Sequence, residues 1–146
     1  MARFMKMLNN ISRSQAVFRR SRISAADFPS MQYAYVYAIC RNPGRSQEEL
    51  ARELCINKST AARAMMRLED KGYITRTPLP NDKRQFSVHP TEKMKAILPE
   101  VAAASAEWTA LLSEGIPQEE LEIFNSVLER MQARAAEIIA KQEENQ

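Results

Sequence analysis

The sequence predicts a mainly α-helical fold of the α+β class, in which helices surround one small β-hairpin. Two observations carry this prediction. Apolar residues recur every three or four positions along most of the 146-residue chain, and only 3 glycines and 7 prolines interrupt the pattern. After Gly72 the spacing shortens to two, which is typical of strands. We therefore expect helices at both ends and a pair of strands near the middle.

Composition excludes several classes of protein. Hydrophobic residues make up 45% and charged residues 27% of the chain, a balance that favours a globular domain over disorder. No apolar run reaches the length of a membrane span, and the N-terminal segment has no apolar core of a secretory signal, so we expect no membrane partner. Cys40 and Cys55 are too few for a disulfide framework or a zinc site, and a single histidine, His89, excludes a histidine-rich metal site. We expect no metal, no other cofactor and a reducing, cytoplasmic location.

Charge is distributed unevenly, although the net charge is only +3. Residues 1–95 contain 18 basic and 8 acidic side chains and carry +10, whereas residues 96–146 contain 3 basic and 10 acidic side chains and carry −7. A basic front part is typical of a protein that meets a polyanion, and it is also typical of solvated helix surface. The motifs decide between these alternatives.

Two helices are expected before the centre of the chain. The first covers residues 3–22, and the second runs from Pro29 to about Arg41, where residues 42–44 (NPG) end it. Pro29 suits the first position of a helix, because that position needs no N–H for an intrahelical hydrogen bond. The second helix is expected to bury one stripe of side chains: Tyr33, Val36, Tyr37 and Cys40.

The centre begins with two short helices joined by a tight turn. Ser46 and Glu49 form a capping-box pattern that starts the first of them. Asn57 is a strong N-cap for the next helix, residues 58–71, and Gly72 suits the left-handed residue that ends it. This arrangement predicts a helix–turn–helix.

A hairpin follows the helix pair. Residues 73–77 and 85–89 are the two strands, and residues 78–84 form a turn-rich, basic loop between them. Two short helices followed by a basic hairpin make a winged helix–turn–helix, in which the second helix reads DNA and the hairpin is the wing.

Two long helices complete the chain. One runs from Thr91 to about Ser113, residues 114–117 break it, and the last helix starts near Pro117. The last helix carries apolar residues at steps of three and four, a heptad seam that suits packing against another long helix. The first segment of the chain is also apolar on one face, so we expect N- and C-terminal helices that form a homodimer. The seam consists of Leu121, Phe124, Leu128, Met131, Ala135 and Ile138.

The second helix of the pair is expected to read DNA with its outward face. Its inward face consists of Ala61, Ala64, Met65 and Leu68. Arg63 and Arg67 share one outward face and can reach guanine edges or phosphates in a major groove, and Met66 can touch a thymine methyl group. Together with three basic residues of the hairpin, the candidate DNA-binding residues are Lys58, Ser59, Thr60, Ala62, Arg63, Met66, Arg67, Arg76, Lys83 and Arg84.

The wing contributes charges of both signs. Arg84 lies near the tip, where an arginine can enter a narrow minor groove. Asp82 cannot be attracted to DNA, so we expect it to structure the wing by holding the loop or by orienting Arg84. Arg76 on the first strand has two alternatives, contact with phosphate or a pair with an acidic neighbour.

Four segments together resemble the MarR family of transcriptional regulators. They are residues 47–54 (QEELAREL), 57–63 (NKSTAAR), 68–76 (LEDKGYITR) and 82–84 (DKR), and the resemblance is densest over residues 46–92. It implies a homodimer that binds a near-palindromic operator in double-stranded DNA, with the second helix in the major groove and the wing in the minor groove. It also implies that a small phenolic or anionic ligand lowers the affinity for DNA.

The chain departs from the family pattern in three places. Residues 90–94 read PTEKM where the family often has LTEKG, and Cys55 stands in a turn where glycine is common. The peroxide-sensing members carry a reactive cysteine in the first helix, whereas this chain has no cysteine before Cys40. That mechanism is therefore not expected here.

The expected organisation has three parts. Residues 1–28 form an N-terminal dimerisation helix, residues 29–92 the DNA-binding lobe and residues 93–146 the C-terminal dimerisation helices. A small aromatic or anionic effector is the expected ligand. Its candidate binding residues are Tyr33, Tyr37 and Trp108, with packing in the core as the alternative role of these aromatic side chains.

The sequence favours a ligand-responsive, DNA-binding regulator, most simply a repressor. An enzyme is not expected, because the chain has no Gly-rich phosphate loop, no paired nucleophile and base and no metal constellation. Two alternatives stay open. A winged-helix protein-interaction module would present an apolar outward face, which Ala62 and Met66 allow and the two arginines oppose. A thiol-responsive regulator would use Cys55 and Cys40.

Overall fold

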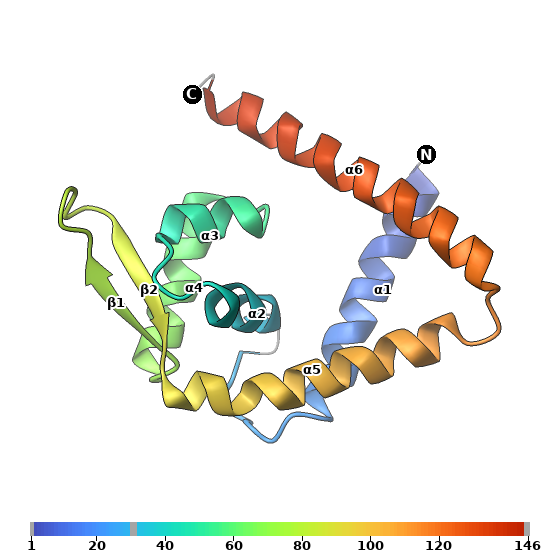
Figure 1. Cartoon of the computed structure of the whole chain (residues 1–146), viewed down its shortest axis with the longest axis horizontal. Helices are drawn as coiled ribbons and strands as arrows, with labels where there is room; N and C mark the ends of the chain where they lie inside the picture. The colour runs from blue at the N-terminus through green and yellow to red at the C-terminus, as the bar shows by residue number, and fades with distance from the viewer. Residues whose placement is uncertain (1, 30–31, 145–146) are drawn as a thin grey trace. The chain divides into compact units, whose positions relative to one another are not determined.

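The computed structural model describes residues 2–29 and 32–144, and it confirms a mainly helical fold with one small hairpin (Figure 1). These residues form two compact units, one up to Trp108 and one from Thr109 on, and the fifth helix runs through the division. In chain order the elements are α1 (Ala2–Arg20), α2 (Tyr33–Arg41), α3 (Gln47–Glu53), α4 (Lys58–Asp70), β1 (Ile74–Pro78), β2 (Phe86–Pro90), α5 (Glu92–Ser113) and α6 (Gln118–Glu144).

Both strands of the hairpin begin one residue later than the sequence pattern predicts. For β1 the cause lies at the end of α4. The Tyr73 N–H donates to the Leu68 carbonyl at 2.8 Å, and the Gly72 N–H donates to the Glu69 carbonyl at 2.9 Å. These two bonds form a Schellman cap, with Gly72 in the left-handed region at φ +75° as predicted. The backbone N–H of Tyr73 therefore belongs to the helix end.

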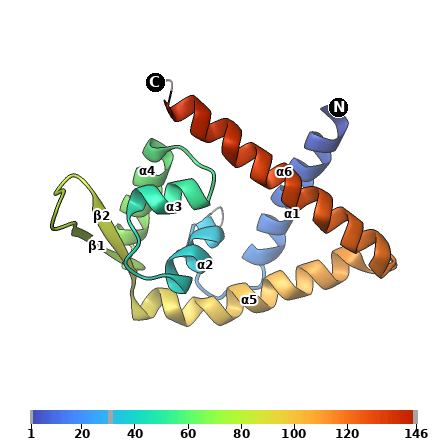
Figure 2. The same ribbon diagram turned by 45° about the horizontal axis from the view of Figure 1, so that its top comes forward.

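The middle of β2 is attached to the segment before α3. The strands are antiparallel, with a register that runs from Ile74 opposite Pro90 to Pro78 opposite Phe86. Val88 of β2 accepts a hydrogen bond from the Gly44 N–H at 2.8 Å and donates one to the Arg45 carbonyl at 2.9 Å. The hairpin lies beside α3 and α4 in both ribbon views (Figures 1 and 2). The wing is thus tied by backbone bonds to the helix–turn–helix.

The core of the first unit lies where α2, α3, α4, the hairpin and α5 meet. Phe28 joins two parts of it, because its ring stacks on Tyr33 at 5.1 Å and meets the edge of Tyr73 at 4.8 Å between ring centroids. The inward face predicted for α4 is confirmed, since Ala61, Ala64, Met65 and Leu68 are all buried. The largest fully buried side chains are Tyr73, Ile39, Leu50, Met65, Leu68, Ile74, Met94, Val36, Val88 and Val101.

Two expectations about the second helix are wrong. It begins at Tyr33, not at Pro29, because Gln32 has non-helical backbone angles and its N–H donates to the Pro29 carbonyl in a separate turn. Residues 30 and 31, which the expected helix included, lie outside the described part. Tyr37 is exposed instead of sharing the buried stripe. The helix is surrounded on more than one side, so it buries a wider face: Tyr33, Tyr35, Val36, Ala38 and Ile39.

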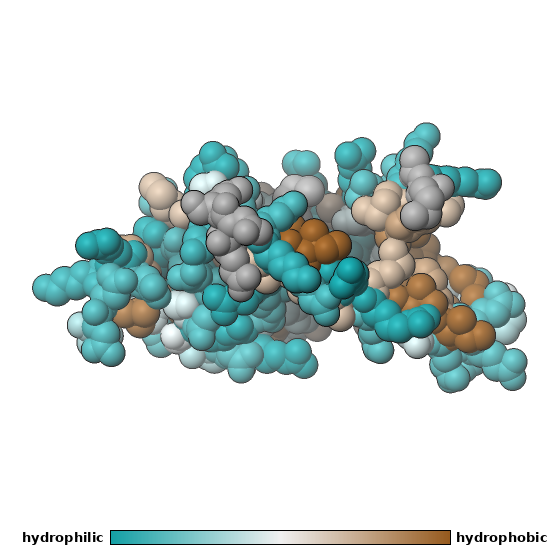
Figure 3. Space-filling view, turned by 90° about the horizontal axis from the view of Figure 1, so that it is seen from above, coloured by the Kyte–Doolittle hydropathy of each residue, from teal (hydrophilic) through white to brown (hydrophobic). Residues whose placement is uncertain are grey.

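The second unit leaves many apolar side chains in contact with solvent. Gly115, at φ +78°, ends the turn after α5, and α6 starts directly after Pro117. Part of this apolar surface is visible as brown side chains at the right-hand end of Figure 3. The exposed large apolar residues from the end of α5 onward are Leu111, Leu112, Ile116, Ile123, Phe124, Val127, Met131, Ile138 and Ile139. None of the helices in residues 2–29 and 32–144 is both long and apolar enough to cross a membrane.

Candidate nucleic-acid interface

The helix before the turn starts at the predicted capping box. The Ser46 hydroxyl accepts the Glu49 N–H at 3.1 Å, and the Glu49 carboxylate accepts the Ser46 N–H at 2.7 Å. This bond from the backbone of Ser46 lowers the pKa of Glu49. α3 ends at a turn in which Cys55 is exposed and has a φ of +53°. The left-handed region favours glycine. The backbone of this turn therefore explains why glycine is common at this position in the sequence pattern that the chain resembles, where this chain has Cys55.

The start of α4 is held by side chains. Asn57 is the N-cap as predicted, and its Oδ1 accepts the Thr60 N–H at 2.7 Å and the Ser59 hydroxyl at 2.9 Å. Lys58 forms an ion pair of 2.6 Å with Glu48 of α3. Ser59 and Thr60 stay exposed at the helix start, where short side chains let a phosphate backbone approach.

The outward face of α4 carries two cations. Arg63 and Arg67 are both exposed, and among residues 2–29 and 32–144 neither guanidinium has an ion-pair partner. Met66 between them is 52% exposed, whereas Ala62 is half-buried. This face therefore offers unpaired donors beside one apolar side chain, a combination that suits base edges, phosphates and a thymine methyl group.

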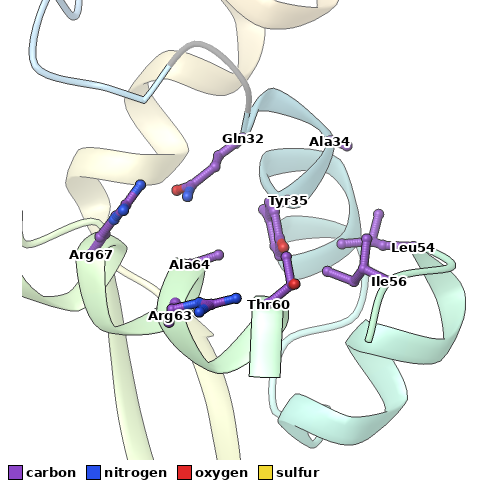
Figure 4. A pocket seen from close by; sticks show the side chains of 9 residues that line it. All are labelled: Gln32, Ala34, Tyr35, Leu54, Ile56, Thr60, Arg63, Ala64 and Arg67. Atoms are coloured by element: carbon purple, nitrogen blue, oxygen red, sulfur yellow. The ribbon is translucent and has the colours of Figure 1, made fainter. Parts of the chain in front are cut away.

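A pocket of about 320 Å³ lies between α4 and the start of α2 (Figure 4). The side chain of Arg67 is directed toward Gln32, and that of Arg63 toward Tyr35. Gln32 is 9% exposed, and its Oε1 is buried without a hydrogen-bond partner among residues 2–29 and 32–144. The lining residues are Gln32, Ala34, Tyr35, Leu54, Ile56, Thr60, Arg63, Ala64 and Arg67.

The wing tip is ordered by Asp82, as predicted. Its carboxylate accepts the backbone N–H of Arg84 at 3.0 Å, and its carbonyl accepts the Gln85 N–H at 3.0 Å. Of the two roles considered for Asp82, the structure shows that of holding the loop. Lys83 and Arg84 are exposed on this loop.

A groove of about 150 Å³ separates the wing from the helix–turn–helix. It brings together two predicted DNA-binding residues from distant parts of the chain, Lys58 at the start of α4 and Arg84 on the wing. Gln47 and Glu48 of α3 and Gln85 and Phe86 of the hairpin complete its lining.

Arg76 is paired with an acidic neighbour, the second of its two alternatives. Its guanidinium donates to the Glu69 carboxylate at 2.6 and 2.9 Å, and this bond lowers the pKa of Glu69. The Arg76 side chain is only 17% exposed. Its contact with phosphate stays a prediction.

The three candidate effector residues do not share one environment. Tyr33 is 3% exposed and packs on Phe28 in the core, which fits the alternative role. Tyr37 is exposed and its hydroxyl donates to the Ser105 hydroxyl at 3.1 Å, while the half-buried Trp108 lies 5.3 Å from the Phe18 ring. A role of these residues in ligand binding stays a prediction.

Sequence reasoning missed Arg19 as a functional candidate. The residue is half-buried on α1, and its Nε is buried without a hydrogen-bond partner in the described part of the chain. Burial lowers the pKa of Arg19, while Tyr37 and Tyr33 act in the opposite direction. The signal was present in the sequence, because Arg19 follows Ile11 by eight positions and so continues the apolar stripe of the helix.

The two thiols lie in different surroundings. Cys40 is half-buried against the core, and burial raises the pKa of its thiol. Cys55 is exposed. No cluster of three His, Cys, Asp or Glu side chains in the described ranges is arranged to bind a metal ion.

The capped helix pair, its outward arginines and the attached hairpin define a winged helix–turn–helix, the fold of a large class of DNA-binding transcription regulators. Residues 26–85 match the MarR family. The chain is 32% identical over 131 residues to YybA, an uncharacterized HTH-type transcriptional regulator of Bacillus subtilis (strain 168), with 85% of this chain and 87% of that protein covered. The chain therefore belongs to the MarR family of transcriptional regulators.

Solved structures agree with this assignment. A MarR transcriptional regulator from Methanosarcina mazei Go1 has a TM-score of 0.81 at 30% identity, with 94% of this chain and 99% of that one covered. A MarR family transcriptional regulator from Listeria monocytogenes, solved in complex with a 26mer DNA, has a TM-score of 0.84 at 24% identity, with 96% of this chain and 93% of that one covered. The second comparison shows the common fold.

Proposed function

We propose that the protein is a homodimeric, sequence-specific repressor that binds a near-palindromic operator and leaves it when a small aromatic or anionic effector binds. The observation that carries the proposal is the outward face of α4, where Arg63 and Arg67 are exposed and unpaired within the described ranges. An exposed pair of guanidinium groups on a capped helix favours a nucleic acid over an apolar protein surface. The Listeria relative solved with DNA supports this choice.

The proposed interface uses both parts of the fold. α4 enters the major groove with Lys58, Ser59, Thr60, Ala62, Arg63, Met66 and Arg67, and the wing places Lys83 and Arg84 at the adjacent minor groove. Lys58 and Arg84 line one groove, which supports simultaneous contact of helix and wing with the same duplex. Two such units are expected about 34 Å apart, one turn of B-DNA.

Dimerisation is the second part of the proposal. α6 is 27 residues long, and an open groove of about 490 Å³ on it is lined by Val127, Met131, Ala135 and Ile138 with Arg130 and Arg134 beside them. A continuous apolar surface of this kind favours association. The heptad spacing supports a second copy of this chain as the partner that covers the apolar surface of α6. In this proposal, residues 1–28 and 93–146 of both chains form the dimerisation parts, and residues 29–92 form the DNA-binding lobe.

The effector is expected to be anionic or aromatic because of Arg19. A half-buried guanidinium with an unpartnered Nε favours a carboxylate or phenolate, and Tyr37 and Trp108 supply aromatic surface nearby on α2 and α5. The thiol-responsive alternative depends on Cys55, which is the more accessible thiol. The regulator is proposed to act in the cytoplasm.

The test is binding of the purified protein to the DNA upstream of its own gene and to a scrambled duplex over a salt series. Selective binding with a steep salt dependence is expected. Arg63→Ala and Arg67→Ala are expected to weaken selective binding, whereas Lys95→Ala, which removes one exposed charge on α5, serves as the matched control. Equal, weak binding to both duplexes, followed by a failure to enrich any sequence from random DNA, contradicts the proposal and favours the protein-interaction alternative.

A further inference from the structure

The side chain of Arg76 contacts three other elements of the fold. It projects from β1 and donates to Glu69 of α4 through Nε at 2.9 Å and Nη2 at 2.6 Å. Its Nη1 donates to Gln47 of α3 at 3.4 Å, and its guanidinium carbon lies 5.2 Å from the ring centroid of Phe86 on β2. The Arg76 N–H also donates to the same Glu69 carboxylate at 3.2 Å.

This junction uses the donors that a phosphate would need. The Arg76 side chain is 17% exposed, and turning it toward DNA would leave the half-buried Glu69 carboxylate unpaired. A planar guanidinium satisfies a carboxylate and an amide at fixed angles, which the single ammonium of lysine cannot do. The arrangement therefore fits an internal link better than a phosphate contact.

The link joins the two surfaces that are proposed to read DNA. Glu69 follows Arg67 by two residues on α4. Arg76 pairs with Val88, which lies on β2, the strand that follows the wing loop. The hairpin is also tied at the middle of β2, where Val88, opposite Arg76, bonds to Gly44 and Arg45. The side-chain bonds of Arg76 to α4 restrict rotation of the hairpin about that attachment.

We propose that Arg76 is a positioning residue that fixes the wing against the recognition helix, so that Arg84 and the arginines of α4 reach one duplex without further ordering. This inference rests on the proposed function. A wing held at the correct angle loses little orientational freedom when DNA binds, and its contact then adds to that of the helix. Without the link, the contribution of Arg84 is reduced although Arg84 itself is intact.

The test compares Arg76→Gln, Arg84→Ala and the double variant with the wild-type protein in operator binding over a salt series. Arg76→Gln is expected to weaken binding about tenfold with an unchanged salt slope, and to weaken it less than threefold in the Arg84→Ala background. Glu69→Ala is expected to reproduce the effect of Arg76→Gln, because it removes the carboxylate to which Arg76 donates. The inference would be overturned if Arg76→Gln weakened binding by the same factor with and without Arg84→Ala and also lowered the salt slope by about one. That result would assign Arg76 to a contact with a DNA phosphate.

A second measurement separates this inference from the proposed function. The orientation of the hairpin relative to α4 is measured by residual dipolar couplings on the DNA-free protein. In Arg76→Gln we expect motion of the hairpin to reduce its residual dipolar couplings by averaging, while the couplings of α4 stay unchanged. Identical couplings in both proteins overturn the positioning role even if no operator is found, and absence of selective binding by the wild type contradicts only the proposed function.

Discussion

The Tyr73 hydroxyl donates a hydrogen bond of 2.6 Å to Oδ1 of Asp27, and Lys93 contacts Oδ2 of the same carboxylate at 2.7 Å. The Lys93 ammonium also lies 4.3 Å from the centroid of the Tyr73 ring. One carboxylate thereby joins the segment after α1, the end of α4 and the start of α5. This cluster connects the proposed DNA-binding lobe to the helices on both sides of it.

The Asp27 cluster predicts a pH dependence of stability. The hydrogen bonds from Lys93 and Tyr73 lower the pKa of Asp27, so its contribution is present above the unfolded-state value of about 3.9 and is lost as pH falls through the lower folded-state value. Burial and the bond to Asp27 raise the pKa of Tyr73, so its contribution is complete below about 10 and is lost as pH rises further.

We therefore expect Asp27→Asn to lower the free energy of unfolding at pH 7 and to differ less from wild type at pH 3. Urea unfolding at pH 3, 5 and 7 measures this difference, with Asp70→Asn as a control at an exposed position on α4. A deficit of Asp27→Asn that stays the same from pH 7 to pH 3 would rule out the charged cluster as its cause.

Arg84→Ala is expected to weaken operator binding by about 1–3 kcal/mol. The reason is the ordered loop, in which Asp82 holds the backbone of Arg84 and leaves its guanidinium exposed at the wing. Fluorescence anisotropy with a labelled operator measures the effect. The neighbouring Lys83→Ala removes the same charge and is expected to cost less, so equal losses would assign the wing a diffuse electrostatic role, and wild-type affinity of Arg84→Ala would remove it from the interface.

Cys55→Gly is expected to keep or raise stability, because the residue occupies the left-handed region at φ +53°. A side chain there costs about 1–2 kcal/mol that glycine avoids, although glycine gains more entropy in the unfolded chain. Cys55→Val is expected to lower the free energy of unfolding by about 1–2 kcal/mol, since β-branching adds to that cost. Thermal and urea unfolding of both variants test this.

The same variant also tests the thiol-responsive alternative. If oxidant releases the wild-type protein and Cys55→Gly equally from DNA, Cys55 is not the sensor. Loss of the oxidant response in the variant would support that alternative.

Leu128→Asp is expected to convert a dimer into monomers. Leu128 lies on the heptad seam of α6, and a carboxylate buried there would lack a partner. Sedimentation equilibrium at several concentrations measures the change. Ser126→Asp introduces the same charge on the opposite side of the helix and is expected to leave the dimer intact. A monomeric wild-type protein, or a dimer that survives Leu128→Asp, would contradict the seam as the interface.

The accuracy of the sequence prediction varied with the range of the interactions that decide each element. The capping box at Ser46, the N-cap at Asn57 and the left-handed Gly72 were all predicted, because each depends on residues within four positions. The inward face of α4 was predicted for the same reason. Local patterns also placed the wing loop, though not the one-residue shift of its strands.

Long-range contacts explain what the pattern did not predict. The width of the buried face of α2 depends on how many neighbours surround it, so Tyr37 was misplaced while Tyr35 and Ile39 were overlooked. The junction of Arg76 with Gln47 and Glu69 joins residues up to 29 positions apart, and only the folded chain shows which charges pair. Only the folded chain shows that Arg19 and Gln32 each bury a polar atom that has no partner among the described residues.

Gln32→Met is expected to raise the free energy of unfolding by about 1 kcal/mol, since a buried acceptor without a partner costs roughly 1–3 kcal/mol. Gln32 is 9% exposed, and within the residues that the structure describes its Oε1 has no partner and its side chain makes no capping bond to α2. Methionine has a similar length and fills the same space without that cost.

The same substitution at Gln47 provides the contrast that makes this expectation specific. The Oε1 of Gln47 accepts a hydrogen bond from Arg76, so Gln47→Met removes a satisfied interaction and is expected to lower stability or leave it unchanged. Urea unfolding of the two variants side by side measures both signs. A loss of stability in Gln32→Met equal to that in Gln47→Met would mean that the Gln32 carbonyl is hydrogen-bonded in solution, with either the Arg67 guanidinium or water in the pocket between α2 and α4 as the donor.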